Sequence, residues 1–202
     1  MIKLYYLKTD FIDKYNIDEL SKYRKDKANR YKSNKDRNLS LAAGLVFNMG
    51  LKKLYNLKEK EIDIGLLEYG KPYVINHPEI NFNIAHSGSM SICVFSSNRV
   101  GCDIEQVRRF NIDVMNRCYS DKEIEFINKA DDKDLAFTRI WLHKEAFLKN
   151  LGIGLNDNMK NISIIIDNNV ISVKQDLDNN EYIFEERRIN DYLISICCLK
   201  QC

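Results

Sequence analysis

Two acidic side chains stand two residues apart in the segment Val100-Gly101-Cys102-Asp103-Ile104-Glu105, whose apolar residues indicate a β-strand. Side chains alternate between the two faces of a strand, so Asp103 and Glu105 share one face. Neighbouring carboxylates repel each other unless water solvates them or a cation binds them, and hard oxygen ligands suit Mg²⁺ or Mn²⁺ better than zinc. The pair therefore indicates either an exposed strand face or a site for a divalent cation.

A second candidate element runs from Trp141 to Lys149, with the sequence WLHKEAFLK. At helical pitch Trp141, Glu145, Leu148 and Lys149 share a face. Read plainly, Glu145 and Lys149 form an ordinary i,i+4 ion pair, and Trp141 anchors the core. Because Glu145 lies beside a core tryptophan, it supplies a third carboxylate to the acidic strand if this helix packs on that strand.

Groups that bind anions occur in the first half of the chain. In the segment 81–89 a predicted strand runs into a small polar turn, where the backbone N–H groups, the His86 ring and the Ser87 hydroxyl fit phosphate oxygens; a histidine that merely caps the strand is an equally good interpretation. The turn Gly70-Lys71-Pro72 adds one cation. A basic stretch fits either a solvated helix face or capture of a dianionic phosphate. Its cations are Lys22, Arg24, Lys25, Lys27, Arg30, Lys32, Lys35 and Arg37.

Together these features fit a substrate that carries a pyrophosphate and a separate phosphate. A carboxylate-held divalent ion would neutralise charge on the transferred and leaving groups. The chain contains no Walker A sequence, no G-x-G-x-x-G and no kinase signature, which disfavours an ordinary ATP-dependent enzyme.

The elements that must position these residues follow from apolar periodicity and cap signals. We expect strands at 2–7, 62–68, 73–75, 81–85, 91–95, 100–105, 161–166, 182–187 and 192–199, and helices at 18–31, 34–55 and 134–151. Ser120-Asp121-Lys122-Glu123 reads as a capping box that starts a further helical segment. The order strand, helices, strands occurs twice, which predicts an α+β fold of two similar α/β halves that meet near residue 100. A doubly wound parallel sheet is the weaker alternative.

Composition excludes several classes of protein. The chain has 202 residues, is 45% hydrophobic and 30% charged, and has a formal net charge of only +2. These values argue against a disordered chain and against a globally basic nucleic-acid binder. No apolar run reaches the ~18–20 residues of a membrane span, and the N-terminus reads as a first strand, not a signal peptide. Six cysteines without C-x-x-C spacing favour a reduced, cytoplasmic protein.

The chain resembles the 4′-phosphopantetheinyl transferases of the larger, surfactin-synthetase-activating type. The resemblance spans roughly residues 20–165. It is carried by Tyr69-Gly70-Lys71-Pro72, FNIAHSG (82–88), Val100-Gly101-Cys102-Asp103-Ile104-Glu105, WLHKEAFLK (141–149) and Gly152-Ile153-Gly154-Leu155, in that order. It implies a pseudo-dimer within one chain, with a coenzyme A-binding half at 1–100 and a metal-binding half at 101–202. It also implies a monomer.

The resemblance implies a reaction and its site residues. The 4′-phosphopantetheine arm of coenzyme A moves to a serine of an apo acyl or peptidyl carrier protein, and adenosine 3′,5′-bisphosphate leaves. Asp103, Glu105 and Glu145 hold Mg²⁺, with Mn²⁺ as the second candidate. Glu145, or a water that it orients, takes the serine proton, and Lys149 lies near the transferred phosphate or the leaving group. The residues implied in coenzyme A binding are Arg24, Lys27, Arg37, Lys71, Pro72, His86 and Ser87.

The chain departs from the family pattern at the anion site. Ala85 precedes His86 where the family often has serine, so backbone N–H groups or Ser87 must replace that hydroxyl. Asn38 and Leu39 stand where a second basic residue often follows the Asp-Arg pair. Two other functions remain open, a metal-dependent phosphohydrolase that acts on a nucleotide pyrophosphate and a non-catalytic module that binds RNA or another polyanion. We expect neither a nucleic-acid nor a membrane partner.

Overall fold

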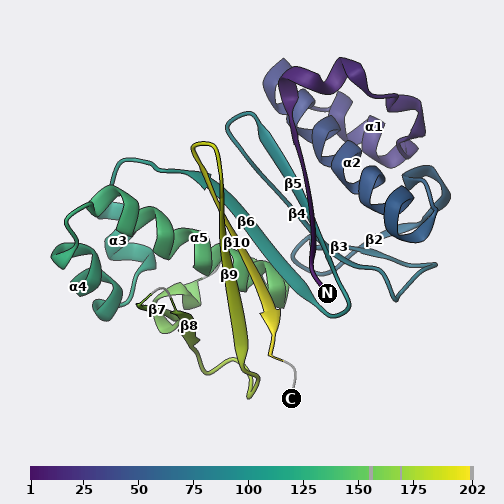
Figure 1. Cartoon of the computed structure of the whole chain (residues 1–202). Helices are drawn as coiled ribbons and strands as arrows, with labels where there is room; N and C mark the ends of the chain where they lie inside the picture. The colour runs from purple at the N-terminus through teal and green to yellow at the C-terminus, as the bar shows by residue number, and fades with distance from the viewer. Residues whose placement is uncertain (155–156, 169, 201–202) are drawn as a thin grey trace. The chain divides into compact units, whose positions relative to one another are not determined.

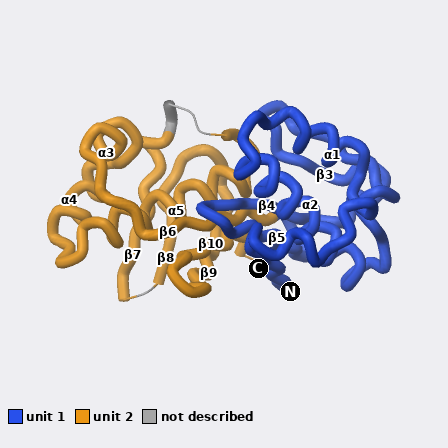
Figure 2. Tube along the Cα trace, turned by 90° about the horizontal axis from the view of Figure 1, so that it is seen from above, with its two compact units in different colours: residues 1–99 blue, residues 100–202 orange. Residues whose placement is uncertain are grey.

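The computed structural model describes residues 1–154, 157–168 and 170–200 (Figure 1). The chain forms two compact units, Met1–Arg99 and Val100–Cys202 (Figure 2). Leu155 of the Gly-Ile-Gly-Leu motif lies outside the described residues. Among the residues described, no helix combines the length and the apolar character that a membrane crossing requires.

The first unit is built on a three-stranded antiparallel sheet with the order β1-β5-β4. A long helix, α2, packs on this sheet through Phe47, whose ring stacks on Phe82 at 4.2 Å and on Phe95 at 5.7 Å between centroids. Its strands and helices are β1 (Lys3–Lys8), α1 (Lys22–Asn29), α2 (Asn34–Tyr55), β2 (Ile64–Leu66), β3 (Pro72–Val74), β4 (Asn81–Ser87) and β5 (Met90–Ser96). Short 3₁₀ turns are η1 (Thr9–Lys14), η2 (Ile17–Glu19) and η3 (Glu59–Glu61).

The second unit also holds a three-stranded antiparallel sheet, with the order β6-β10-β9. Helix α5 packs on this sheet, and two shorter helices and a two-stranded sheet complete the unit. Its elements are β6 (Val100–Gln106), α3 (Ile112–Cys118), α4 (Asp121–Lys129), α5 (Lys133–Leu151), η4 (Asp157–Asn161), β7 (Ser163–Asp167), β8 (Val170–Lys174), β9 (Tyr182–Ile189) and β10 (Tyr192–Leu199).

The two units repeat one topology. Each begins with a strand, continues through helices and a two-stranded sheet, and ends with a hairpin whose last strand becomes the centre of the three-stranded sheet. Every strand pair in the described part of the chain is antiparallel. The predicted α+β class with two similar halves is confirmed, and the doubly wound parallel alternative is wrong.

Several predicted boundaries shift for identifiable reasons. The helix expected at 18–31 begins only at Lys22, because the Ser21 hydroxyl accepts a hydrogen bond from Arg24 N at 3.1 Å and caps α1 there. Helix α3 was not specifically predicted; its seven residues are capped by Asn111, which accepts from two backbone N–H groups. Strand β8, also absent from the expected elements, is short and mostly exposed, so its apolar pattern is weak.

Candidate functional site

The acidic strand β6 and the helix α5 are in backbone contact at Gly101. A Cβ atom at this position would lie 2.1 Å from the carbonyl oxygen of Ala146 and 2.2 Å from the backbone nitrogen of Asn150. Only glycine allows so close an approach of helix to strand. Gly101 shares its strand face with Asp103 and Glu105, so the helix comes down on the face that carries the carboxylates.

This packing brings Glu145 and Lys149 to Asp103. The Lys149 Nζ lies 2.6 Å from Asp103 Oδ1 and 3.7 Å from Glu145 Oε2. Asp103 is only 5% exposed, and its second oxygen, Oδ2, is buried without a hydrogen-bond partner in the described part of the molecule. The helix therefore directs its acid toward the strand, and one oxygen of a buried carboxylate is left unsatisfied at the meeting point.

The charges of the three acids act on one another. Burial raises the pKa of the Glu145 carboxyl above its usual value, and although Lys149 opposes this, the charges of Asp103 and Glu105 raise that pKa further. Burial by itself lowers the pKa of Lys149, but the adjacent Asp103 and Glu145 more than compensate, so this pKa lies well above its usual value. Lys149 is therefore a protonated cation among carboxylates at neutral pH.

Arg108 completes this neighbourhood from the loop after β6. Its Nη1 lies 3.7 Å from Glu105 Oε1, and its guanidinium lies over the Trp141 ring at 4.7 Å from the centroid. Its Nε and Nη2 atoms are buried without a hydrogen-bond partner among the residues described. Trp141 thus acts as more than a core anchor, since its ring carries the cation that balances Glu105.

The residues present fit a hard divalent cation in chemistry, although their conformation favours the lysine. Three carboxylates and an unsatisfied buried oxygen are the donor set that Mg²⁺ prefers. Within the described ranges, no three Asp, Glu, His or Cys side chains are arranged to hold a metal ion. The positive charge at Asp103 comes from Lys149, so a bound cation requires the lysine to give up this contact.

A buried polar network that the sequence analysis missed fixes α5 on its sheet. His143 is fully buried, and its Nδ1 and Nε2 atoms lie 2.8 Å from Ser195 Oγ and 2.9 Å from Glu186 Oε2. Strand register places Ser195 directly between Asp103 and Glu186. The sequence signal for this network is weak, because the buried face of α5 also carries Thr138, Lys144 and Asn150.

Lys144 forms a second buried anchor. Its Nζ lies 2.8 Å from Glu123 Oε2, and both side chains are completely buried. The Glu123 carboxylate also accepts hydrogen bonds from the backbone nitrogens of Ser120 and Ile164, at 2.8 and 2.7 Å. The predicted capping box is confirmed, and its glutamate also binds α4 to α5.

The first unit contains a pocket of about 200 Å³ at which several predicted anion-binding residues meet. Arg24 and Lys27 come from α1, Pro72 from β3 and His86 from β4. Its other lining residues are Tyr23, Tyr31, Asp36, Leu39, Ser40, Ala43, Leu66, Gly70 and Ile84. Desolvation, followed by the neighbouring Arg24 charge, lowers the pKa of Lys27.

The remaining three predicted residues do not line this pocket. Lys71 and Ser87 are direct chain neighbours of lining residues. Arg37 lies exposed in the first turn of α2. The basic stretch therefore divides into two lining cations, Arg24 and Lys27, and a set of cations elsewhere on the two helices and in the connection between them.

The expected phosphate-binding turn is not a turn at His86. Strand β4 continues through His86, which pairs with Ser91, to Ser87, which pairs with Met90. The turn proper is Gly88 and Ser89, with Gly88 at a φ of 58°. Pairing with β5 extends the strand beyond Ala85, so His86 approaches the pocket as a strand side chain.

Comparison with known proteins agrees with this arrangement. Residues 13–98 match the family described as 4′-phosphopantetheinyl transferase, N-terminal, and residues 99–197 match the 4′-phosphopantetheinyl transferase superfamily. The two matches together extend over almost the whole chain, which belongs to the 4′-phosphopantetheinyl transferase superfamily.

Among curated relatives, the 4′-phosphopantetheinyl transferase Sfp of Bacillus subtilis is 33% identical over 125 residues, which are 60% of this chain and 55% of that protein. The L-aminoadipate-semialdehyde dehydrogenase-phosphopantetheinyl transferase of Candida glabrata is 27% identical over 164 residues, 74% of this chain and 62% of that protein. The matched region spans about half the length of the bacterial relatives. A holo-[acyl-carrier-protein] synthase structure from Neisseria meningitidis covers 50% of this chain and 97% of its own, at 16% identity and a TM-score of 0.44.

Proposed function

We propose that this protein transfers the 4′-phosphopantetheine arm of coenzyme A to a serine of an apo acyl or peptidyl carrier protein. The observation that carries the proposal is the cluster of Asp103, Glu145 and Lys149, assembled by the contact of α5 with Gly101. Membership of the transferase superfamily supports the same conclusion.

In this reaction the serine oxygen forms a bond to the phosphorus that bears the pantetheine arm. The bond from that phosphorus to the bridging pyrophosphate oxygen breaks, and adenosine 3′,5′-bisphosphate leaves. Glu145 takes the serine proton, directly or through a water that it orients, and its raised pKa suits a general base better than an ordinary surface carboxylate. Protonated Lys149 donates hydrogen bonds to the phosphate oxygens or the leaving group.

Asp103, Glu105 and Glu145 are the residues that would hold Mg²⁺, with Mn²⁺ as the alternative ion. An ion held by these residues would supply positive charge that stabilises negative charge on the pyrophosphate oxygens. The unsatisfied Asp103 Oδ2 supports this assignment, because a buried carboxylate oxygen without a partner is costly unless something binds it.

The pocket of the first unit is the proposed site of the adenosine end of coenzyme A. Arg24 and Lys27 meet the 3′-phosphate, His86 contacts a phosphate, and Pro72 lines the adenosine. Lys71 and Ser87 contribute from positions next to the lining residues, and Arg37 contributes long-range attraction from its exposed position. We further propose that the protein is cytoplasmic and acts as a monomer.

Incubation with coenzyme A, Mg²⁺ and a panel of apo-carrier proteins tests the proposal. Intact-protein mass spectrometry is expected to show a phosphopantetheine mass gain on one serine of at least one carrier, and chelation of the metal is expected to abolish it. Cleavage of coenzyme A without a protein acceptor would instead identify a phosphohydrolase. Steeply salt-dependent RNA binding without any transfer would identify a polyanion-binding module.

A further inference from the structure

A buried carboxylate contacts Arg24, one of the two cations that line the first unit's pocket. Glu59 in η3 is fully buried, and its Oε1 atom accepts hydrogen bonds from Arg24 Nε at 3.1 Å and from the Ser21 hydroxyl at 3.3 Å. Ser21 in turn accepts from the backbone nitrogen of Arg24. Arg24 is therefore held at its backbone and at the inner edge of its guanidinium.

The stem of Arg24 is confined by α2. A Cβ atom at Gly44 would lie 2.7 Å from Arg24 Cγ and 3.0 Å from its Cδ, so the arginine runs across the helix where no side chain blocks it. The two terminal guanidinium nitrogens have no hydrogen-bond partner among the residues that the structure describes. They are not among the buried unsatisfied atoms, and Arg24 is one of the residues that line the pocket. The free edge of the guanidinium is thus the edge available to a ligand.

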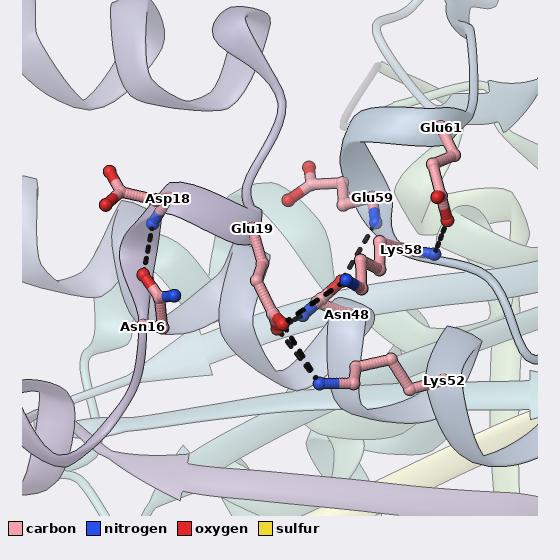
Figure 3. Close-up of polar contacts among 8 residues, drawn as sticks. All are labelled: Asn16, Asp18, Glu19, Asn48, Lys52, Lys58, Glu59 and Glu61. Carbon is pink, nitrogen blue, oxygen red and sulfur yellow. Dashed lines mark hydrogen bonds and ion pairs between the residues drawn. The ribbon is translucent and has the colours of Figure 1, made fainter.

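Glu59 is itself held in a rigid socket (Figure 3). Its backbone nitrogen donates to Asn48 Oδ1 at 2.9 Å, and Asn48 Nδ2 donates to Glu19 Oε2 at 3.0 Å. The Glu61 side chain closes η3 by accepting from the backbone nitrogen of Lys58 at 2.7 Å. These hydrogen bonds fix the backbone of Glu59 and therefore the position from which its carboxylate contacts Arg24.

We infer that Glu59 is a positioning residue that holds Arg24 Nε so that the guanidinium presents its two terminal nitrogens as a fork to the 3′-phosphate of coenzyme A. This inference rests on the proposed function of the pocket and adds a residue that makes no contact with the ligand. Two parallel N–H donors match two phosphate oxygens, and an arginine fixed beforehand loses less freedom when it binds.

The cost of Glu59 supports a role of this kind. Its Oε2 atom is buried without a hydrogen-bond partner in the described part of the chain, and its charge cancels part of the attraction that Arg24 offers to an anion. An apolar residue would avoid both penalties. The benefit that remains is geometric, because the acceptor at Oε1 fixes the direction of the guanidinium.

Binding measurements without catalysis test the inference. Calorimetry compares coenzyme A with 3′-dephospho-coenzyme A on the full-length protein, and the ratio of their Kd values reports the preference for the 3′-phosphate. E59L removes the acceptor at nearly constant volume and is expected to lower this preference about tenfold. E59Q keeps an acceptor for Arg24 Nε and is expected to stay within about threefold of the wild type. K60A is the matched control, because Lys60 is an exposed residue of the same 3₁₀ turn and lies outside the hydrogen bonds that hold Glu59, and it is expected to leave the ratio unchanged.

E59L leaves a buried arginine without its partner, so R24A and R24A/E59L provide a comparison in which that arginine is absent. If Glu59 acts only through Arg24, the double variant has the same preference as R24A. A further loss in the double variant, equal loss of both ligands in E59L, or full preference in E59L would overturn the inference. Full preference in R24A would overturn it at the level of the 3′-phosphate contact, whereas the mass gain on a carrier protein tests the transfer reaction separately.

Discussion

At the scale of single residues, Lys149 defines the state of the acidic cluster. Its ammonium group lies 2.6 Å from Asp103 and 3.7 Å from Glu145, so one cation balances a buried acid and a partly buried one. The desolvation cost of these carboxylates is already met in the folded protein. A metal ion that displaces the lysine ammonium therefore does not have to bring the carboxylates out of water. A metal ion that binds here as proposed would take the place of the lysine ammonium.

The variants D103A and E145A are each expected to lower carrier-protein modification by about a hundredfold or more. D103A removes a carboxylate that is proposed to bind the cation, and E145A removes the proposed base. Rates from intact-protein mass spectrometry provide the measurement, with circular dichroism to verify the fold. E125Q is a suitable control because Glu125 lies in an exposed ion pair with Lys129. A fully active D103A protein would refute the assignment.

The pocket separates two basic residues that the sequence places in one stretch. K27A is expected to raise the KM for coenzyme A about tenfold and to affect 3′-dephospho-coenzyme A much less, because Lys27 lines the pocket. R37A is expected to change both substrates slightly and equally, because Arg37 is exposed outside the lining. Steady-state kinetics with both substrates measure these KM values. A larger effect of R37A than of K27A on coenzyme A would place the 3′-phosphate near Arg37 and not in the pocket.

At the scale of elements, the contact between α5 and β6 determines whether the cluster forms at all. In G101A the new methyl group meets backbone atoms of α5 at 2.1 and 2.2 Å, so the helix must shift. We expect G101A to lower the free energy of unfolding by about 1–3 kcal/mol or more. We also expect G101A to lose more activity than D103A, because D103A removes one charge whereas G101A displaces the helix. Denaturant unfolding measures the first quantity.

Gly70 offers the matched control for that substitution. Its Cβ position is open, with no heavy atom of the described structure within 4 Å, but its φ of 81° strains any L side chain, asparagine less than most. G70N is therefore expected to cost only this backbone strain, about 1 kcal/mol in the free energy of unfolding. Equal destabilisation by both variants would show that G101A acts through something other than the helix contact.

The buried pair of Lys144 and Glu123 connects α5 to α4. K144M leaves the Glu123 charge buried without its countercharge and is expected to destabilise the protein by about 3–5 kcal/mol. K144M/E123Q removes the charge and keeps the cap, so it is expected to recover part of this loss. K129M breaks an exposed pair and is expected to cost less than about 1 kcal/mol. Urea denaturation of the three variants provides the comparison.

Local patterns predicted most of the elements, and for physical reasons. The apolar spacing of α2, the capping box at Ser120 and the end of α5 at Gly152 are all short-range signals, and the structure confirms each of them. The alternation in β6 likewise predicted that Asp103 and Glu105 share a face. Such signals depend only on neighbours in the chain.

Contacts between distant segments were beyond those patterns. The sequence did not indicate that Glu59 would pair with Arg24, because nothing near either residue records the other. The sequence likewise did not indicate that His143 would be fully buried against Ser195 and Glu186. The one readable signal for the α5 contact was Gly101 inside a strand, since glycine there often marks a close backbone approach.

At the scale of the whole molecule, the repeated topology contrasts with an unequal distribution of chemistry. Both units follow the same order of elements, with the last strand central in each sheet. The first strand of the second unit carries the acidic pair, whereas β1, at the corresponding place in the first unit, has the sequence KLYYLK and no acid. The cationic pocket, conversely, belongs to the first unit. The two halves are therefore alike in fold and different in the charged side chains that they carry.

This asymmetry predicts one ligand for each chain. A repeat that kept its chemistry in both halves would bind two coenzyme A molecules, whereas a repeat that divided its chemistry binds one. Calorimetry is expected to give a stoichiometry near one, and light scattering is expected to give a monomer near the chain mass of 23.7 kDa. K27A serves as the control, because the loss of one cation from the first unit's pocket should weaken all of the binding and leave the monomer unchanged. Two equivalent sites in each chain would contradict the prediction of one ligand. A dimer that alone binds the ligand would mean that residues from two chains form the site.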